Sequence, residues 1–296
     1  MTQGAASAVM FRRGTFPSSA SLLLYFLTVN SPEQYLTVHY KDSKNADVFN
    51  FFHSNRMPEL FWHTDLHSHV CPGIDDGSPN REQSVNLVRG MWDLGFRRMI
   101  VTPHVTDELF PNTPEIISVS YLRLIDAVKS AGIDMQFNYS AEYRIDELLK
   151  DYLDNGLVRP LPGGRHLLVE CGWSQPPYDI DGFIYRLRDE FNLIPVLAHP
   201  ERYPYYQHHP EVYEHLHNLG VMFQVNLLSL AGHYDKNCKH TAEWLLSNNL
   251  IEFIGSDLHR MSHLESLRHY FTSRDYRKLE AKQDLILNDI VFDEQT

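Results

Sequence analysis

From Phe61 onward, short runs of β-forming residues alternate with segments of helical periodicity, and this alternation constrains the fold more than any other feature of the chain. One helix is predicted by the apolar spacing between Val85 and Leu94, begun by Ser78-Pro79-Asn80 and ended by Gly95. Further helices are predicted over 121–128, 213–219 and 241–246. Strands are predicted over 61–66, 98–102, 136–140, 167–170, 194–198, 222–226 and 251–255.

Strands that are separated by helices need parallel crossover connections, which place the protein in the α/β class. Seven such units within about 200 residues predict a closed or nearly closed barrel of the TIM type, one strand short of the usual eight. An open, doubly wound sheet is the alternative. In either fold the reactive face lies at the carboxyl ends of the strands.

Ionisable side chains follow almost every predicted strand. If packing alone decided these positions they would hold Val, Ile or Leu, and burying so many ionisable groups is costly unless cations compensate them. Nitrogen and carboxylate ligands suit manganese, iron or zinc, often with two or more ions. The sixth strand is the exception and ends in Asn226. The ionisable residues at the other six strand ends are Asp65, His67 and His69, His104, Glu142, Glu170, His199 and Glu201, and Asp257 and His259.

Two of these strand ends hold a pair of side chains in alternate positions. Residues i and i+2 of a strand point to the same side, so His67 and His69 can both reach one ion. Asp257 and His259 have the same spacing. Each pair by itself is weak support for a metal site, and the joint pattern over many strands carries the prediction.

The motifs, taken in their order, resemble the PHP (polymerase and histidinol phosphatase) family, and within it the capsule-locus protein-tyrosine phosphatases of the CpsB/YwqE type. The resemblance runs from about Trp62 to about His269. The motifs that carry it are Asp-x-His-Ser-His at 65–69, Pro-Gly-Ile-Asp-Asp-Gly at 72–77, Thr-Pro-His at 102–104, Ala-Glu at 141–142, Val-Glu at 169–170, Ala-His-Pro-Glu-Arg-Tyr at 198–203 and Ser-Asp-x-His at 256–259.

The resemblance implies a distorted (β/α)7 TIM-like barrel, the PHP barrel, with two or three metal ions. Manganese is the usual metal of the family, and iron, zinc or magnesium also suit the ligands. Carried over to this chain, one ion takes His67, His69, Glu142 and Asp257; a second takes Glu142, His104 and His199; and a third takes Asp76, Glu170 and His259.

The implied activity is that of a metal-dependent phosphomonoester hydrolase acting on phosphotyrosine of a bacterial tyrosine kinase that controls capsule or exopolysaccharide synthesis. The implied location is the cytoplasm. The resemblance does not decide between a monomer and a homo-oligomer. Arg202 is implied to bind the phosphate oxygens, because its planar guanidinium can donate two parallel hydrogen bonds. Relatives can carry a second such Arg in a Gly-Arg-x-Pro stretch, where this chain has Arg260-Met261-Ser262-His263. The sequence offers Asp75 and His263 as candidate general acids.

Three other activities are weighed against this prediction. The first is hydrolysis of a small phosphate ester such as histidinol phosphate by the same PHP site. The second is a metal-dependent amidohydrolase, whose common bridging lysine is absent from the predicted strand ends. The third is a phosphotyrosine-binding regulator without catalysis, which the full ligand set disfavours. A cysteine-based phosphatase is excluded, because the sixth residue after Cys71, Cys171 and Cys238 is never Arg.

Composition and the first residues set the remaining limits. With 26 Lys and Arg against 38 Asp and Glu, the net charge of −12 argues against nucleic-acid binding and against an anionic membrane surface. Three distant cysteines fit a reducing compartment. Residues 1–55 are predicted to be a poorly ordered extension, with Met57 as an alternative start, and 56–296 to be the PHP phosphatase domain. The apolar run at 22–29 is too short to span a membrane.

Two loop motifs near the fifth predicted strand are interpreted as structural. Tyr203, Tyr205 and Tyr206 could form an aromatic wall for a substrate ring, but are predicted to be packing residues on a half-exposed loop surface. The adjacent His208 and His209 resemble ligands, yet they lie well past the strand end. A solvated turn is predicted for them.

Overall fold

A computed structural model describes residues 26–29, 36–39 and 57–294. These residues belong to two units of the chain, divided after Arg56. In the first unit, β1 (Phe26–Val29) pairs antiparallel with β2 (Leu36–His39). The rest of the predicted extension lies outside the described residues, so both the extension and the domain boundary stay predictions. Among the described residues there is no helix with the length and apolar character needed to cross a membrane.

The second unit is built on parallel strands that follow seven segments of the chain. Two of these segments are interrupted, so that β5 continues β4 and β7 continues β6. One sheet has the order β11-β10-β9-β8-β7-β5 and the other the order β3-β4-β6. The strands are β3 (Thr64–Asp65), β4 (Arg98–Val101), β5 (His104–Val105), β6 (Gln136–Tyr139), β7 (Glu142–Arg144), β8 (His166–Glu170), β9 (Ile194–Ala198), β10 (Met222–Asn226) and β11 (Phe253–Gly255).

The first and last strands meet and close the ring. The backbone N–H of Asp257 donates to the carbonyl of His67 at 2.8 Å, and that of His69 to the carbonyl of Leu258 at 3.0 Å. The buried Asp65 carboxylate adds two bonds across the same seam, accepting from the backbone N–H of Ser256 at 2.8 Å and from its hydroxyl at 2.6 Å. The seam is held by these few bonds instead of a regular ladder. The predicted distorted seven-stranded barrel is therefore confirmed.

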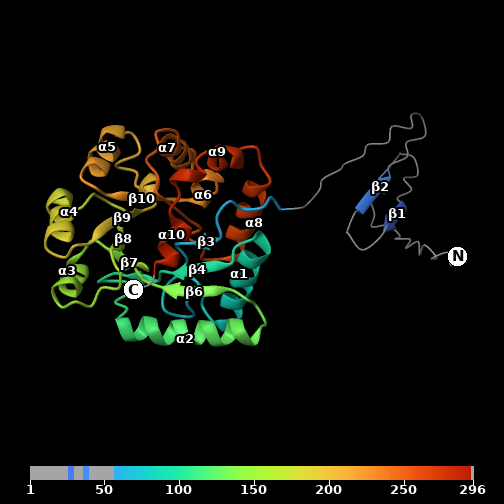
Figure 1. The fold of residues 1–296 in the computed structure, drawn as a ribbon, viewed down its shortest axis with the longest axis horizontal. Helices are drawn as coiled ribbons and strands as arrows, with labels where there is room; N and C mark the ends of the chain where they lie inside the picture. The colour runs from blue at the N-terminus through green and yellow to red at the C-terminus, as the bar shows by residue number, and fades with distance from the viewer. Residues whose placement is uncertain (1–25, 30–35, 40–56, 295–296) are drawn as a thin grey trace, which may run out of the picture. The chain divides into compact units, whose positions relative to one another are not determined.

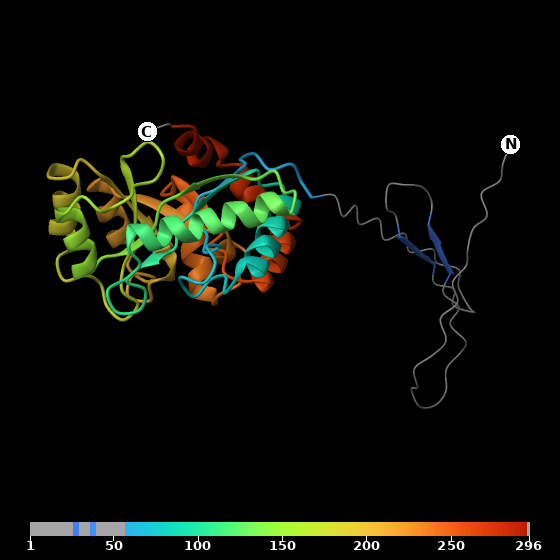
Figure 2. The same cartoon turned by 90° about the horizontal axis from the view of Figure 1, so that it is seen from below.

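The helices surround these strands (Figure 1), and α2 runs along one side of the unit (Figure 2). The four predicted helices correspond to α1, α2, α5 and α7. The structure starts α2 earlier than predicted, because Thr113 caps its first turn and Pro114 suits its first position. The helices are α1 (Arg81–Leu94), α2 (Pro114–Ser130), α3 (Glu147–Asp154), α4 (Ile180–Asp189), α5 (Pro210–Asn218), α6 (Leu227–Leu230), α7 (Lys236–Ser247), α8 (Met261–Phe271), α9 (Tyr276–Glu280) and α10 (Asn288–Asp293).

The barrel interior is apolar towards the amino ends of the strands, and α10 closes that end. Val291 of α10 is buried in one cluster with Leu66, which follows β3, Ile100 of β4 and Phe253 of β11. The Asn288 side chain donates to the carbonyls of Thr64 at 2.9 Å and of Ile254 at 2.6 Å, which fixes α10 to the first and last strands. The polar strand ends are thereby confined to the opposite, carboxyl end.

Candidate metal centre

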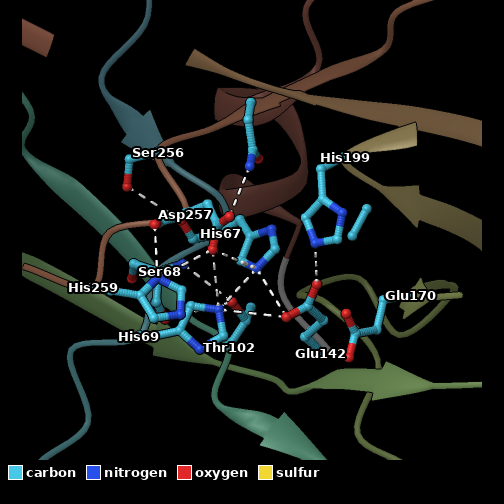
Figure 3. A network of polar contacts seen from close by, with 12 residues as sticks. His67, Ser68, His69, Thr102, Glu142, Glu170, His199, Ser256, Asp257 and His259 are labelled. Carbon is cyan, nitrogen blue, oxygen red and sulfur yellow. Dashed lines mark hydrogen bonds and ion pairs between the residues drawn. The ribbon is translucent and has the colours of Figure 1, made fainter. Parts of the chain in front are cut away.

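All nine predicted ligands lie at the carboxyl end of the barrel. Figure 3 shows the labelled side chains of this region converging, with Glu142 and Glu170 on one side and Asp257 and His259 on the other. Asp76 reaches the cluster from the loop before α1, with its Oδ1 3.5 Å from His104 Nε2 and 3.4 Å from His259 Nε2. The loop at 72–77 thus brings an Asp carboxylate to the cluster, where the resemblance implies a ligand.

Glu142 is the centre of the cluster. Its Oε2 lies 3.3 Å from His67 Nε2, 3.4 Å from His69 Nε2 and 3.0 Å from His104 Nδ1. Its Oε1 lies 2.8 Å from Nε2 of the buried His199. One fully buried carboxylate thus faces four imidazoles, the arrangement expected of a carboxylate shared between ions.

The ligand atoms form three overlapping groups that are compact enough to hold ions. Asp257 Oδ1 also faces the first group, at 3.8 Å from His67 Nε2 and 3.5 Å from His69 Nε2. The structure groups Asp76 and His259 with two histidines, whereas the resemblance groups them with Glu170. How the side chains divide among individual ions stays a prediction. The groups are His67, His69 and Glu142; His104, Glu142 and Glu170; and His69, Asp76, His104 and His259.

Several buried polar atoms of the cluster have no hydrogen-bond partner within the described part of the chain. They include Glu142 Oε2, both carboxylate oxygens of Glu170, and Nδ1 of His104 and of His199. A buried acceptor without a donor is costly, and native proteins rarely tolerate several in one place. Divalent cations would satisfy the carboxylate oxygens together with His104 Nδ1, which faces Glu142 Oε2 at 3.0 Å and Glu170 Oε1 at 3.6 Å. The residues present therefore fit a site for two or more metal ions.

The electrostatics of the cluster point the same way. Burial by itself lowers the pKa of His67, but the carboxylates of Glu142 and Asp257 raise it to about 10. Burial and the charge of Glu142 raise the pKa of Glu170 to about 7. The negative charge of the buried carboxylates therefore favours the protonated forms of His67 and Glu170 when no cation is bound. Cations balance that charge when they bind, so metal binding should release protons.

Hydrogen bonds behind the ligands orient the two histidines of the first strand. His69 Nδ1 donates to Asp75 at 2.9 Å and His67 Nδ1 donates to Gln224 at 2.6 Å. These bonds leave Nε2 of both rings directed at Glu142, as in sites where an outer carboxylate or amide fixes a ligating imidazole. Asp75 is therefore not free to serve as a general acid. Burial tends to raise its pKa, but His69 holds it below its ordinary value, so the carboxylate is ionised.

The Asp75→Asn variant tests this orienting role. We expect the affinity for metal to fall by about 10-fold, because outer partners of this kind contribute roughly 10- to 100-fold. Titration of the purified protein with Mn²⁺ measures the effect, and Asp126→Asn, on the exposed face of α2, is the matched control. Equal affinities for the two variants would contradict the assignment.

The sixth strand takes part through hydrogen bonds, although it contributes no ionisable ligand. The side chain of Gln224 donates to Asn226 at 2.9 Å, and Asn226 donates to Asp257 Oδ2 at 2.8 Å. Together with the bond from His67, this row of amides links the side chains of two predicted ligands, His67 and Asp257. Asp257 itself has a φ of 50° and His199 a φ of 34°. Such left-handed backbone at non-glycine residues is strained and typical of functional sites.

A cavity of about 300 Å³ opens beside the cluster, and the predicted Arg202 lies in its wall. Arg202 Nη1 donates to Asp257 Oδ2 at 2.6 Å. Its guanidinium carbon is 4.6 Å from the ring centre of Trp173 and 4.4 Å from that of Tyr234. Two aromatic contacts and one ion pair thus restrict Arg202, and its other donors are available to the cavity.

The same cavity contains residues that the sequence did not single out. Arg144 follows Glu142 by two positions on β7, a spacing that could have indicated it. Trp173 lies in the loop after β8 and stacks on His199 with ring centres 5.5 Å apart; no local signal marks it. The candidate acid His263 also lines the cavity, but burial lowers its pKa to about 4. Its imidazole is thus neutral at pH 7.

The two loop motifs near β9 are packing and surface features. Tyr203 and Tyr206 are buried in the core, so the expectation of a half-exposed loop is wrong for these two, while Tyr205 is partly exposed. The Tyr203 hydroxyl donates to the carbonyl of Ala198 at 3.1 Å and so braces the loop that carries His199. His208 and His209 are exposed, as predicted.

Comparison with known proteins identifies relatives of this chain. Residues 63–278 match the profile of the family described as capsular polysaccharide synthesis, CpsB/CapC. The tyrosine-protein phosphatase YwqE of Bacillus subtilis is 28% identical over 197 residues, covering 67% of this chain and 77% of YwqE. The tyrosine-protein phosphatase CpsB of Streptococcus pneumoniae is 26% identical over 204 residues, covering 67% of this chain and 83% of CpsB.

Solved structures resemble the fold as well. A crystal structure from the work on YwqE and CpsB, described there as unique metal-dependent tyrosine phosphatases, matches with a TM-score of 0.66 and 26% identity, over 79% of this chain and 95% of the other. An amidohydrolase from Mycoplasma synoviae matches with a TM-score of 0.52 and 15% identity, over 79% of this chain and 89% of the other. The second match concerns the fold alone.

Proposed function

Because the chain belongs to the CpsB/CapC family of capsular polysaccharide synthesis proteins, we propose that it is a metal-dependent protein-tyrosine phosphatase. One observation carries the proposal. Within residues 57–294, Glu142 Oε2 and both carboxylate oxygens of Glu170 are buried without a hydrogen-bond partner, and they adjoin a cavity that also holds Arg202 and Trp173. The site thus combines ligands for cations, a guanidinium for phosphate and an aromatic surface for a ring.

We propose manganese as the metal, in two or three ions, with iron, zinc or magnesium as alternatives that the same ligands accept. Bound divalent ions supply Lewis-acid activation of water and of the phosphoryl group. The chain provides a buried, preformed ligand cluster whose imidazoles are held in place by outer hydrogen bonds. The residues that would hold the ions are His67, His69, Asp76, His104, Glu142, Glu170, His199, Asp257 and His259.

Arg202 binds the phosphate oxygens in this proposal. A guanidinium donates two parallel hydrogen bonds to an oxyanion, and such charge-assisted bonds are stronger than neutral ones. The bond to Asp257 and the two aromatic faces hold its plane, so less conformational freedom is lost when phosphate binds. Its positive charge also offsets the repulsion that a phosphate dianion meets in an acidic protein.

Trp173 gives the cavity its preference for an aryl phosphate. The indole is 41% exposed although it packs on His199, so part of its surface remains free to contact a phenyl ring. A phenolate leaves with a parent pKa near 10 and needs less protonation than an alkoxide. This agrees with a cavity in which Asp75 is engaged elsewhere and His263 is neutral.

The Trp173→Ala variant separates recognition of the ring from phosphate binding. We expect kcat/KM for a phosphotyrosine peptide to fall by about 3- to 10-fold more than kcat/KM for an alkyl phosphate, because an aromatic contact contributes about 0.5–1.5 kcal/mol beyond its area. Steady-state kinetics on both substrates measure the ratio, and Trp173→Phe is the control that keeps a ring. A uniform loss on both substrates would contradict this role.

The substrate we propose is a phosphotyrosine protein, specifically a bacterial tyrosine kinase that controls capsule or exopolysaccharide synthesis. Full-length protein loaded with Mn²⁺ should hydrolyse a phosphotyrosine peptide with higher kcat/KM than histidinol phosphate. The reverse order would favour the small-ester alternative.

All three cysteines, Cys71, Cys171 and Cys238, are free and buried, in keeping with the cytoplasmic location that we propose.

A further inference from the structure

Arg144 is a partly buried residue in the wall of the cavity beside the metal cluster. It occupies the last position of β7, paired in register with Glu170 of β8, and lines the same cavity as Arg202. Its side chain is only 23% exposed. Because Glu142 and Arg144 are alternate residues of one strand, both side chains point to the same side of the sheet. The guanidinium is therefore carried by the strand that also carries the central carboxylate.

The Arg144 side chain has donors that nothing in residues 57–294 accepts. Its Nε is buried and has no hydrogen-bond partner there. The Glu170 carboxylate is nearby, with Oε1 at 3.5 Å from Nε, but this distance is too long for a good N–H···O bond. Arg202, in contrast, has one donor engaged by Asp257 at 2.6 Å. A buried guanidinium donor without an acceptor, in the wall of an anion-binding cavity, points to a ligand oxygen as its partner.

We propose that Arg144 is a second guanidinium that contacts the phosphoryl group, together with Arg202. This inference rests on the proposed phosphatase function. The two arginines accompany different carboxylates of the cluster, Arg144 next to Glu170 and Arg202 bonded to Asp257. Each therefore offsets a negative charge that would otherwise repel the incoming phosphate, and donates hydrogen bonds to it.

Arg260 is the competing candidate for this second guanidinium. It precedes α8 and is exposed at the rim of the cavity. An exposed, flexible side chain gains less from an ion pair than a partly buried one, because solvent screens the charge and ordering the side chain costs entropy. Burial and the unpartnered Nε therefore favour Arg144.

The test uses the full-length, Mn²⁺-loaded protein and the variants Arg144→Ala, Arg144→Lys and Arg260→Ala. Arg123→Ala, on the exposed face of α2, removes one positive charge elsewhere and is the matched control. Three quantities are measured for each protein: kcat/KM for a phosphotyrosine peptide, the dissociation constant of inorganic phosphate by calorimetry, and the bound metal by elemental analysis. Inorganic phosphate is chosen because it tests the phosphate contact without the ring or the chemical step.

We expect Arg144→Ala to lower kcat/KM by about 10- to 100-fold and to weaken phosphate binding by a similar factor, the usual effect of losing hydrogen bonds to a charged group. Metal content should not change. Arg144→Lys keeps a positive charge beside Glu170 but loses the planar fork, so it should stay at least about 5-fold below the unmodified protein. Arg260→Ala should have a smaller effect than Arg144→Ala.

Three results would overturn the inference. If Arg144→Ala loses metal and Arg144→Lys restores both metal and activity, then Arg144 only balances the charge of Glu170. If Arg260→Ala causes the larger loss of phosphate binding, the second guanidinium is at the rim. If Arg144→Ala binds phosphate like the control, Arg144 does not contact it. An unmodified protein without turnover would instead contradict the proposed function itself.

Discussion

The Glu142→Gln variant should lose at least about 10³-fold in phosphotyrosine hydrolysis, and most of its bound metal with it. Glu142 is fully buried and faces His67, His69, His104 and His199 at 2.8–3.4 Å. An amide of the same shape keeps the volume but removes the negative charge that two ions would share. Loss of bound cations removes several kcal/mol of transition-state stabilisation.

The control for this variant is Glu147→Gln, an exposed residue of α3. Elemental analysis and steady-state kinetics are carried out on both proteins after identical purification. Circular dichroism checks that the barrel is folded, because a change at a buried carboxylate can also affect stability. A folded Glu142→Gln protein with normal metal content and normal turnover would refute the central role of this carboxylate.

Removal of the metal should abolish turnover and lower the melting temperature together. A ligand at 1,000 times its dissociation constant adds about 4 kcal/mol to the stability of the folded state. For a domain of this size, that corresponds to a fall in Tm of roughly 8–16 °C when the ion is removed. The folded state loses stability because the cluster then contains buried carboxylates without cations to balance their charge. Calorimetry and hydrolysis assays before and after dialysis against a chelator measure both effects.

Restoring Mn²⁺ should recover both quantities in the unmodified protein. The double variant His67→Ala/His69→Ala provides the comparison, because it lacks two ligands of one ion group. Added metal should produce a smaller rise in its Tm and no recovery of turnover. Hydrolysis of phosphotyrosine that survives both chelation and the double change would exclude the metal-dependent mechanism.

The barrel could be predicted because parallel strands and their helices leave separate periodic signals along the chain. The predicted strands at 194–198 and 222–226 coincide with β9 and β10. The prediction at 61–66 is too long, since β3 is only Thr64–Asp65. Its neighbour across the seam is β11, almost 190 residues later, and the seam depends on Asp65 and Ser256. No local pattern specifies such a pairing.

That the nine residues act as ligands stays a prediction, but the gathering of eight of them could be foreseen, because the chemistry of each residue type and its place at a strand end are both local properties. The roles of Asp75 and Asn226 could not. Asp75 was a candidate acid, yet the fold places it behind His69 at 2.9 Å. Asn226 interrupted the ionisable pattern, yet it donates to Asp257 at 2.8 Å. Both roles depend on distances between side chains, which sequence order does not contain.

The sequence alone determined a seven-unit α/β barrel with its ionisable side chains at the carboxyl end, where it predicts a metal site. It could do so because all parallel strands point the same way, so that strand ends distant along the chain become neighbours. The tertiary structure alone decided which buried polar atoms have a hydrogen-bond partner and which have none. Within residues 57–294, Glu142 Oε2, both oxygens of Glu170 and Nε of Arg144 lack hydrogen-bond partners, and Trp173 stacks on His199. These features arise only when separate strands and loops pack together. Hydrogen bonds and burial depend on relative positions of a few tenths of an ångström, and such positions are set by the whole fold.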